Sequence, residues 1–191
     1  MTADLRAALR PAITLLLLLT LLLGLAYPLA VTGVAQTLMP WQAHGSLLRD
    51  GDRVVGSALI GQSFISPRYF QGRPSAAGQG YDANASSGSN LGPNERTLIE
   101  RVAADKARLG GEATPDRVTA SASGLDPHIS PAAALAQAGR VASARGLPPA
   151  QVEALVRGSV EHASLGIVGE PRVNVLLLNH RLDAAARAPA R

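Results

Sequence analysis

The longest hydrophobic segment of the chain lies close to its N-terminus. No Asp, Glu, Lys or Arg occurs from Pro11 to Leu48, and Ile13 to Leu25 is almost continuously leucine. Crossing a hydrocarbon core of about 30 Å takes about 20 apolar residues in a helix, which also closes its own backbone hydrogen bonds. The pattern therefore predicts one transmembrane helix over residues 12–34 that is kinked near Gly24 and Pro28.

Two basic residues set the expected direction of this helix. Arg6 and Arg10 lie immediately before it, whereas the next arginine, Arg49, lies well beyond it. The positive-inside bias predicts a cytoplasmic N-terminus, residues 1–11, and a soluble domain outside, residues 35–191. A cleaved signal peptide is the alternative, but its apolar region runs only about 7–15 residues.

Beyond the apolar segment the chain changes to short elements separated by turns. Residues 53–61 have the length and β-branched content of a strand. Residues 63–93 are rich in Gly, Ser, Pro and Asn and have no regular period, yet they hold four of the six aromatic residues of the chain. A disordered linker would be poor in aromatic residues. We therefore expect an ordered, packed loop with residues 86–93 at its tip.

Two helices are predicted next. The first covers residues 94–108, with Asn94 as its N-cap and a Gly-Gly stop. Its apolar stripe consists of Leu98, Ile99, Val102 and Ala103. The second helix has Ser130 as its N-cap, Pro131 at its first position and Gly146 just past its end.

The C-terminal part completes the predicted fold. Residues 149–163 carry apolar residues at helical spacing and predict a third helix ending at Gly166, and the β-branched run at 172–178 predicts a buried strand. Two strands and three helices indicate an α+β fold. The chain is thus expected to be one N-terminal transmembrane helix followed by a single small mixed α/β soluble domain.

Composition removes several classes of function. The net charge is +4 and the pI about 10.3, but the arginines are scattered, Lys106 is the only lysine and aromatic residues make up 3%. Nucleic-acid binding needs a basic cluster interleaved with aromatics, so no nucleic-acid partner is expected. The absence of cysteine excludes disulfides and thiolate metal sites.

The sequence also lacks the motifs of ATP hydrolysis. Lys106 lies within a predicted helix with no Gly-x-x-x-x-Gly-Lys-Ser/Thr loop before it, and no Asp-Lys-Thr run of the kind that transport ATPases phosphorylate is present. Asp126 and His128 could form an acid–base pair or half of a metal site. A carboxylate two residues before a helix-flanking histidine is more often a turn bonded to its own backbone. We therefore expect neither a catalytic nor a metal-ligating residue.

The tip of the long loop is the remaining candidate. Ser86, Ser87, Gly88, Ser89 and Asn90 precede a predicted helix N-terminus, so their successive amides could form an anion-binding nest. The same segment could equally be a surface loop that contacts a protein partner.

Several motifs of the chain resemble one known family. They are Leu59-Ile60-Gly61-Gln62, Tyr69-Phe70-Gln71-Gly72-Arg73-Pro74-Ser75, Ser86-Ser87-Gly88-Ser89-Asn90-Leu91-Gly92-Pro93, Gly124-Leu125-Asp126-Pro127-His128-Ile129-Ser130-Pro131 and Gly169-Glu170-Pro171-Arg172-Val173-Asn174-Val175-Leu176. Together with the anchor, they are similar to the C subunit of the Kdp potassium-transporting P-type ATPase. The resemblance extends from the apolar segment to about Asp183.

The resemblance implies a place in a bacterial inner-membrane complex that imports potassium at the expense of ATP. It implies an accessory, non-catalytic subunit that acts as a catalytic chaperone and raises the ATP affinity of the ATPase subunit. Its partners would be that subunit, a potassium-channel-like subunit and membrane lipid. It would have no cofactor of its own, because ATP and potassium are bound by the complex. A domain outside the membrane cannot reach cytoplasmic ATP, so its effect would pass through the partners as a coupling free energy.

Candidate binding residues follow from both lines of reasoning. Those for a partner or nucleotide are Gln62, Ser86, Ser87, Gly88, Ser89, Asn90, Asp126 and His128. The alternative function is a membrane-anchored periplasmic enzyme or binding domain that uses Asp126 and His128.

Overall fold

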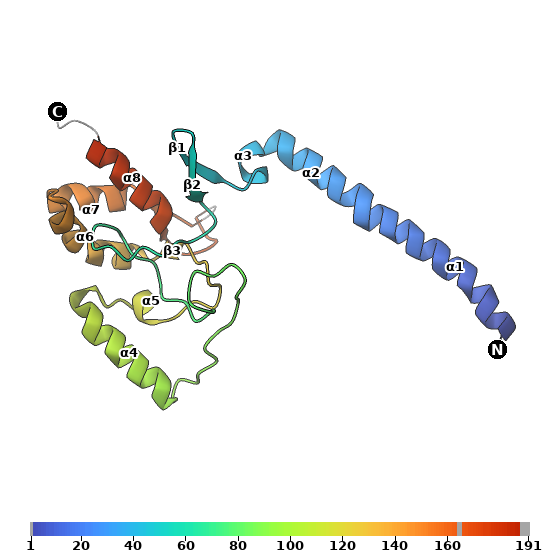
Figure 1. The fold of residues 1–191 in the computed structure, drawn as a ribbon, viewed down its shortest axis with the longest axis horizontal. Coiled ribbons are helices and arrows are strands. Elements are labelled where there is room, and N and C mark those ends of the chain that lie inside the picture. The colour runs from blue at the N-terminus through green and yellow to red at the C-terminus, as the bar shows by residue number, and fades with distance from the viewer. Residues whose placement is uncertain (1, 164–165, 188–191) are drawn as a thin grey trace. The chain divides into compact units, whose positions relative to one another are not determined.

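The computed structural model describes residues 2–163 and 166–187, and the chain divides into two compact units, Met1–Val55 and Gly56–Arg191. The first unit is dominated by a continuous helical rod that consists of α1 (Thr2–Leu21), the π-helical turn η1 (Leu22–Ala26) and α2 (Tyr27–Leu38) (Figure 1). By length and composition, Arg6–Leu38 can cross a membrane, and none of its most apolar window is buried. The expected single apolar N-terminal helix is therefore confirmed.

The expected kink near Gly24 and Pro28 corresponds to a local change of helix type. The Tyr27 N–H donates to the Leu22 carbonyl, five residues back, which widens this turn. Because a proline ring crowds the carbonyl four residues before it and has no N–H to donate, a widened turn just before Pro28 accommodates it.

A short helix and a hairpin follow the rod. After α3 (Pro40–Ala43), strands β1 (Leu47–Asp50) and β2 (Arg53–Ser57) form a two-stranded sheet. The predicted strand over 53–61 thus ends four residues early, because the Ile60 N–H turns back to the Ser57 carbonyl at 3.1 Å. Strand β1 was not predicted.

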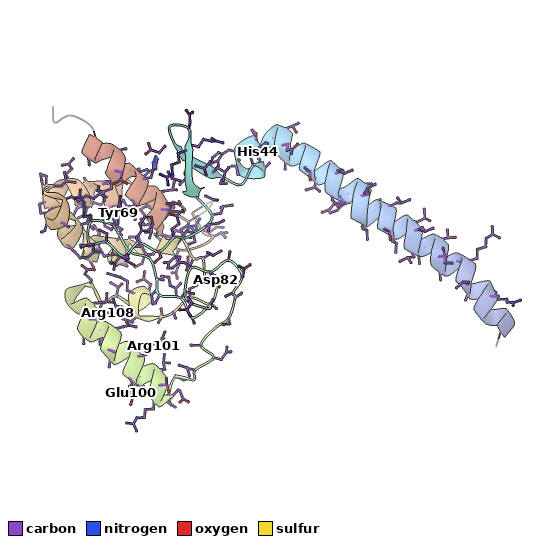
Figure 2. The ribbon with its side chains drawn as sticks, viewed as in Figure 1. His44, Tyr69, Asp82, Glu100, Arg101 and Arg108 are labelled. Carbon is purple, nitrogen blue, oxygen red and sulfur yellow. The ribbon has the colours of Figure 1, made fainter. Side chains whose placement is uncertain are left out.

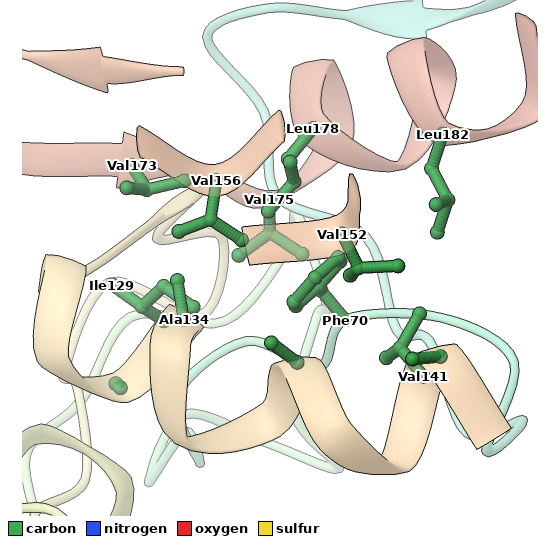
Figure 3. Close-up of a cluster of buried hydrophobic side chains, with 13 residues drawn as sticks. Phe70, Ile129, Ala134, Val141, Val152, Val156, Val173, Val175, Leu178 and Leu182 are labelled. Carbon is green, nitrogen blue, oxygen red and sulfur yellow. The ribbon is translucent and has the colours of Figure 1, made fainter. Parts of the chain in front are cut away.

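The second unit is built on helices and a small sheet. Helices α6 (Pro131–Arg145), α7 (Pro149–Arg157) and α8 (Val175–Arg187) enclose most of the core. Strands β3 (His128–Ile129), β5 (Arg172–Asn174) and β4 (Val160–Glu161) form an antiparallel sheet in that order. Figure 3 shows Phe70 among Val141, Val152 and Val175 in this core. The mixed helix and sheet content confirms the α+β prediction.

Helix α6 begins and ends as its sequence predicts. The Ser130 hydroxyl accepts a hydrogen bond from the Ala133 N–H at 3.0 Å, Pro131 is the first helical residue, and Gly146 adopts a left-handed conformation at the C-cap. The buried face of α6 is largely alanine and valine, which allows α7 to pack close to it.

Two predictions for the C-terminal part are wrong in extent. Helix α7 ends at Arg157 rather than Ala163, because Gly158 caps it and Val160 pairs with Val173 in the sheet. The predicted strand over 172–178 ends at Asn174, where α8 takes over. The Asn174 side chain accepts the Leu177 N–H at 3.1 Å and so acts as an N-cap.

Helix α4 (Arg96–Leu109) confirms the predicted helix but not its cap. Glu95, not Asn94, is the N-cap residue, and no side-chain hydrogen bond caps the helix. The turn η2 (Gly110–Glu112) and the short helix α5 (Pro115–Val118) follow the Gly-Gly stop. None of the residues of α4 is buried, and Ile99 of the predicted apolar stripe is 57% exposed.

The long loop is ordered, as predicted, through side-chain hydrogen bonds. Residues 58–95, all described, contain no helix or strand apart from the isolated bridge of Ser75 to Ser121. Phe70 is fully buried. The side-chain amide of Asn179 on α8 accepts a hydrogen bond from the Phe70 N–H and donates one to the Phe70 carbonyl, both at 2.9 Å. Gln137 of α6 likewise accepts the Gln71 N–H at 2.8 Å and donates to the Gln71 carbonyl at 3.1 Å. These two amides replace the strand partner that the loop lacks.

Candidate functional site

Asp126 and His128 lie together at the start of β3. One Asp126 oxygen accepts the His128 backbone N–H at 3.0 Å, and the other pairs with Arg73 at 3.2 Å. Both carboxylate oxygens therefore have partners within this chain. This is the backbone-bonded turn that the sequence favoured over an acid–base pair.

The His128 ring lies near two carboxylates without a hydrogen bond to either. Its Nδ1 is 3.9 Å from Asp126 and its Nε2 is 3.9 Å from Glu161, both beyond hydrogen-bond length. Glu161 in turn pairs with Arg172 at 3.1 Å. Burial lowers the pKa of His128. The Glu161 carboxylate raises it, Arg172 lowers it further, and Asp126 raises it. The net shift of the His128 pKa is downward.

Asp126, His128 and Arg172 line a surface pocket of about 390 Å³, and Glu161 is not among its lining residues. The lining also includes Asp116, whose carboxylate accepts the Ser130 N–H at 2.7 Å. Burial raises the pKa of Asp116, but hydrogen bonds from Ser130 and Thr114 outweigh burial, so the net shift is downward. Among the described residues no group of three or more His, Asp or Glu side chains could hold a metal ion.

Tyr81 and Gly72 support the arginine of this cluster. The Tyr81 hydroxyl donates to the Arg73 carbonyl at 3.1 Å and lies against Gly72, where any Cβ would collide with it. Tyr81 adopts a positive φ of 54°, an uncommon conformation for an aromatic residue that persists only when its surroundings hold it. Burial and then Asp126 raise the pKa of Tyr81, whereas Arg73 lowers it.

The backbone next to Gln62, rather than its side chain, approaches the cluster. The preceding residue, Gly61, donates its N–H to the Leu125 carbonyl at 2.9 Å, and a Cβ on Gly61 would lie 2.6 Å from the Asp126 carbonyl. Only glycine permits this approach. The Gln62 side-chain amide instead lies next to Gly56.

The tract from Ser86 to Asn90 runs beside the segment that leads to Asp126. Gly88 lies near Ala122, and Gly124 lies near the Ala85 and Asp82 carbonyls. Within the tract Gly88 is half-buried, the other residues are exposed, and Asn90 has a positive φ of 53°. No tract residue is among the described residues that line the pocket, so Asp126 and His128 are brought together but the tract and Gln62 flank them.

Sequence reasoning missed four members of this cluster. Arg73, Glu161, Arg172 and Tyr81 come from a loop and two strands that only the fold brings together. Glu161 and Arg172 carry opposite charges and lie opposite each other on β4 and β5. This pair could have been found only from the register of the two strands.

Comparison with known proteins identifies relatives over nearly the whole chain. The sequence model of the family described as KdpC, K+-transporting ATPase, c chain, matches residues 9–184. A KdpC subunit of a potassium-transporting ATPase from Caulobacter vibrioides is 62% identical over 182 residues, covering 92% of each chain. Those from Caulobacter sp. and Rhodospirillum rubrum are 58% identical over 188 residues, covering 95% of each chain, and 56% identical over 183 residues, covering 92% of this chain and 94% of the relative.

Proposed function

The chain belongs to the KdpC family of potassium-transporting ATPase subunits, and from that premise we propose that it acts as a catalytic chaperone. It is an accessory subunit of the potassium transport complex rather than its catalytic one. In this proposal it docks on the ATPase subunit and on a potassium-channel-like subunit, and it raises the affinity of the ATPase subunit for ATP. ATP and potassium are bound by those partners.

The commitment of the Asp126 carboxylate supports a docking role over a catalytic one. A general base acts through an atom that lies about 2.6–3.2 Å from the atom whose proton it removes, and a third group commonly orients it. Each Asp126 oxygen already accepts a hydrogen bond, one from Arg73 and one from the His128 N–H, and the His128 ring is too far from either neighbouring carboxylate to be oriented by it. The hydrogen bonds of Asp126 instead hold Arg73 and the His128 backbone in place at the surface of the domain. We propose that this surface, flanked by Gln62 and Ser86–Asn90, contacts a partner subunit.

Arg6 and Arg10, which precede the uncharged apolar stretch, support an inward N-terminus in the bacterial inner membrane. With the second unit in the periplasm, its effect on ATP reaches the cytoplasm through the partner subunits. A coupling of about 1–3 kcal/mol would change the apparent ATP affinity by roughly 5- to 150-fold.

Reconstitution of the complex with and without this chain tests the function. We expect the chain alone to hydrolyse no ATP, and its addition to lower the KM for ATP of potassium-stimulated hydrolysis by at least about fivefold. His128→Ala and Asn90→Ala should weaken co-purification, with Arg157→Ala, an exposed residue of α7, as the control. Hydrolysis by the chain alone, or an unchanged KM, would refute the proposal.

The orientation has its own test, because the chain has no native cysteine. Gln151→Cys, at an exposed position of α7, should react with a membrane-impermeant maleimide in intact spheroplasts. Ala8→Cys, at an exposed position before the apolar stretch, should react only after permeabilisation. The reverse pattern would place the second unit in the cytoplasm and would make direct contact with ATP feasible.

A further inference from the structure

A second pocket, which shares Arg73 with the pocket at Asp126 and His128, has an unusual distribution of charge. It has a volume of about 350 Å³ and is lined by Arg73, Arg108 and Arg117 together with Phe64, Ile65 and Tyr81. The described lining includes no carboxylate. We call it the arginine pocket.

The carboxylates that balance these arginines lie outside the lining. Arg73 pairs with Asp126, Arg108 with Asp105 at 2.8 Å, and Arg117 with Glu112 at 2.5 Å. The three arginines therefore line the pocket, whereas the carboxylates paired with them do not. A carboxylate that enters the pocket meets several guanidinium groups, which present paired donors suited to it.

The three arginines differ in how readily they can take a new partner. Arg117 is 4% exposed and is held by Glu112 and by Gln71 at 3.0 Å, so it is a fixed positive charge. Arg108, at the C-terminal end of α4 (Figure 2), is 61% exposed, and its bond to Asp105 is a surface pair of small energy. Arg108 can therefore turn to an incoming anion at little cost.

An apolar wall accompanies the charge. Ile65 is 86% exposed although it lies beside Phe64 at the edge of the pocket. An aliphatic side chain this exposed gains from being covered, because removing apolar area from water is worth about 25 cal/mol per Å². A small inorganic anion would satisfy the arginines and leave Ile65 in water. A peptide segment can satisfy both.

We propose that the arginine pocket binds an acidic segment of a partner subunit, with an Asp or Glu side chain directed to Arg108 and Arg73 and an adjoining apolar side chain on Ile65. This proposal rests on the proposed docking function and names a second contact for it.

Charge reversal at matched positions on α4 tests the pocket. Arg108→Glu removes a lining charge, whereas Arg96→Glu changes an arginine of the same helix that is 89% exposed, has its own intrahelical partner and is not among the lining residues. We expect Arg108→Glu to weaken assembly of the full chain with its partner subunits by about tenfold or more, since a charge at an interface steers and fixes docking. Arg96→Glu should change it less than about twofold.

Two further arms separate the sources of a negative charge. Ile65→Ser should also weaken assembly, whereas a free phosphate or a lipid headgroup would not need this side chain. Assembly is measured in nanodiscs of phosphatidylglycerol and of phosphatidylcholine. A defect of Arg108→Glu confined to phosphatidylglycerol would assign the pocket to lipid and overturn the proposal, as would equal defects of Arg108→Glu and Arg96→Glu or no defect at all.

The failure of this proposal is distinguishable from failure of the docking function. If the unaltered chain does not assemble or does not change the KM for ATP, the proposed function fails. If the unaltered chain does both and Arg108→Glu does so equally well, only the arginine pocket is refuted. A compensating change of an acidic residue to arginine in the partner that restores assembly of Arg108→Glu would identify the bound segment.

Discussion

Helices α4 and α6 have nearly the same length, 14 and 15 residues, and both follow from apolar residues at helical spacing, but only α6 is built into the core. Val141 of α6 is fully buried, whereas Ile99 of α4 is 57% exposed. Figure 1 shows α6 within the group of α7 and α8, and α4 away from it beside α5. Helical periodicity therefore identifies the element without identifying what covers its apolar face.

The difference arises from what each helix faces. Helix α6 packs on α7 and on Phe70, and its Gln137 and Arg140 bond the backbone of the long loop. Arg140 donates to the Pro67 carbonyl at 2.6 Å and the Tyr69 carbonyl at 3.2 Å. Among the described elements, helix α4 makes substantial contact only with α5 and η2. A segment is fixed by burial and by satisfied polar groups, and regular structure alone does not supply these.

The largest expected effect comes from exchanging polarity between the two helices. Gln137→Leu keeps the volume of a fully buried side chain but leaves the Gln71 N–H and C=O without their partner. Each lost bond costs roughly 1–3 kcal/mol, so the loss of two bonds should lower the free energy of unfolding by about 2–6 kcal/mol. Ile99→Gln, the opposite change on α4, should alter it by less than about 0.5 kcal/mol.

Urea unfolding of the full chain in detergent, followed by circular dichroism, measures both variants. Equal effects of the two changes would contradict the comparison, and so would a destabilising Ile99→Gln, since that result would mean that α4 is covered.

Much of this architecture could be predicted from the sequence. The apolar length of the rod, the Ser130-Pro131 start and the Gly146 end of α6 are local signals, and local signals survive into the fold. The loop was expected to be ordered because it concentrates aromatic residues, and Phe70 confirms this. The short strands β3 and β4 carry no period of their own, so they could not be recognised.

The parts that could not be predicted depend on contacts between distant residues. The sequence places Asn174 in a strand, and only the structure shows that its side chain caps α8. The available signal for that helix was the spacing of Leu178 and Leu182, which are one helical turn apart and both buried. The partners of His128 are set by sheet register, which the sequence of such short strands does not encode. Whether Gln62 and the Ser86–Asn90 tract bind a partner stays a prediction.

A smaller effect is expected from pH at the N-terminal end of α6. The pKa of His128 is lowered in the fold, mainly by burial, so the unfolded chain takes up the proton first as the pH falls below about 6.5. Stability from this residue is present above that pH and is lost as the pH falls through the folded pKa. The pKa of Asp116 is also lowered, so its contribution is lost only in the more acidic range below its ordinary value of 3.8.

The two variants His128→Gln and Asp116→Asn separate these ranges. Urea unfolding is measured between about pH 7 and pH 5, the range in which histidine ordinarily titrates. The pH dependence of the free energy of unfolding should decrease in His128→Gln and be kept in Asp116→Asn. The effect should be smaller than that of Gln137→Leu, because a third of the His128 side chain is exposed. Unchanged pH dependence in His128→Gln would contradict the lowered pKa.

The smallest expected effect is the energy of an ion pair on α4. The Arg96 to Glu100 pair is the shorter at 2.6 Å, but its side chains are 89% and 63% exposed. The Arg140 to Glu112 pair, between α6 and η2, is longer at 2.9 Å, with side chains 25% and 19% exposed. Water and salt screen the first pair, whereas the second lies where the effective dielectric constant is lower and Arg117 fixes the carboxylate.

Double-mutant cycles with Gln replacements should therefore give at most about 0.5 kcal/mol for the α4 pair, vanishing in about 1 M salt. The coupling energy at α6 should be larger and should persist in salt. A stronger coupling at Arg96 would mean that separation rather than burial ranks these pairs, and the contrast between the two helices would then not extend to their charges.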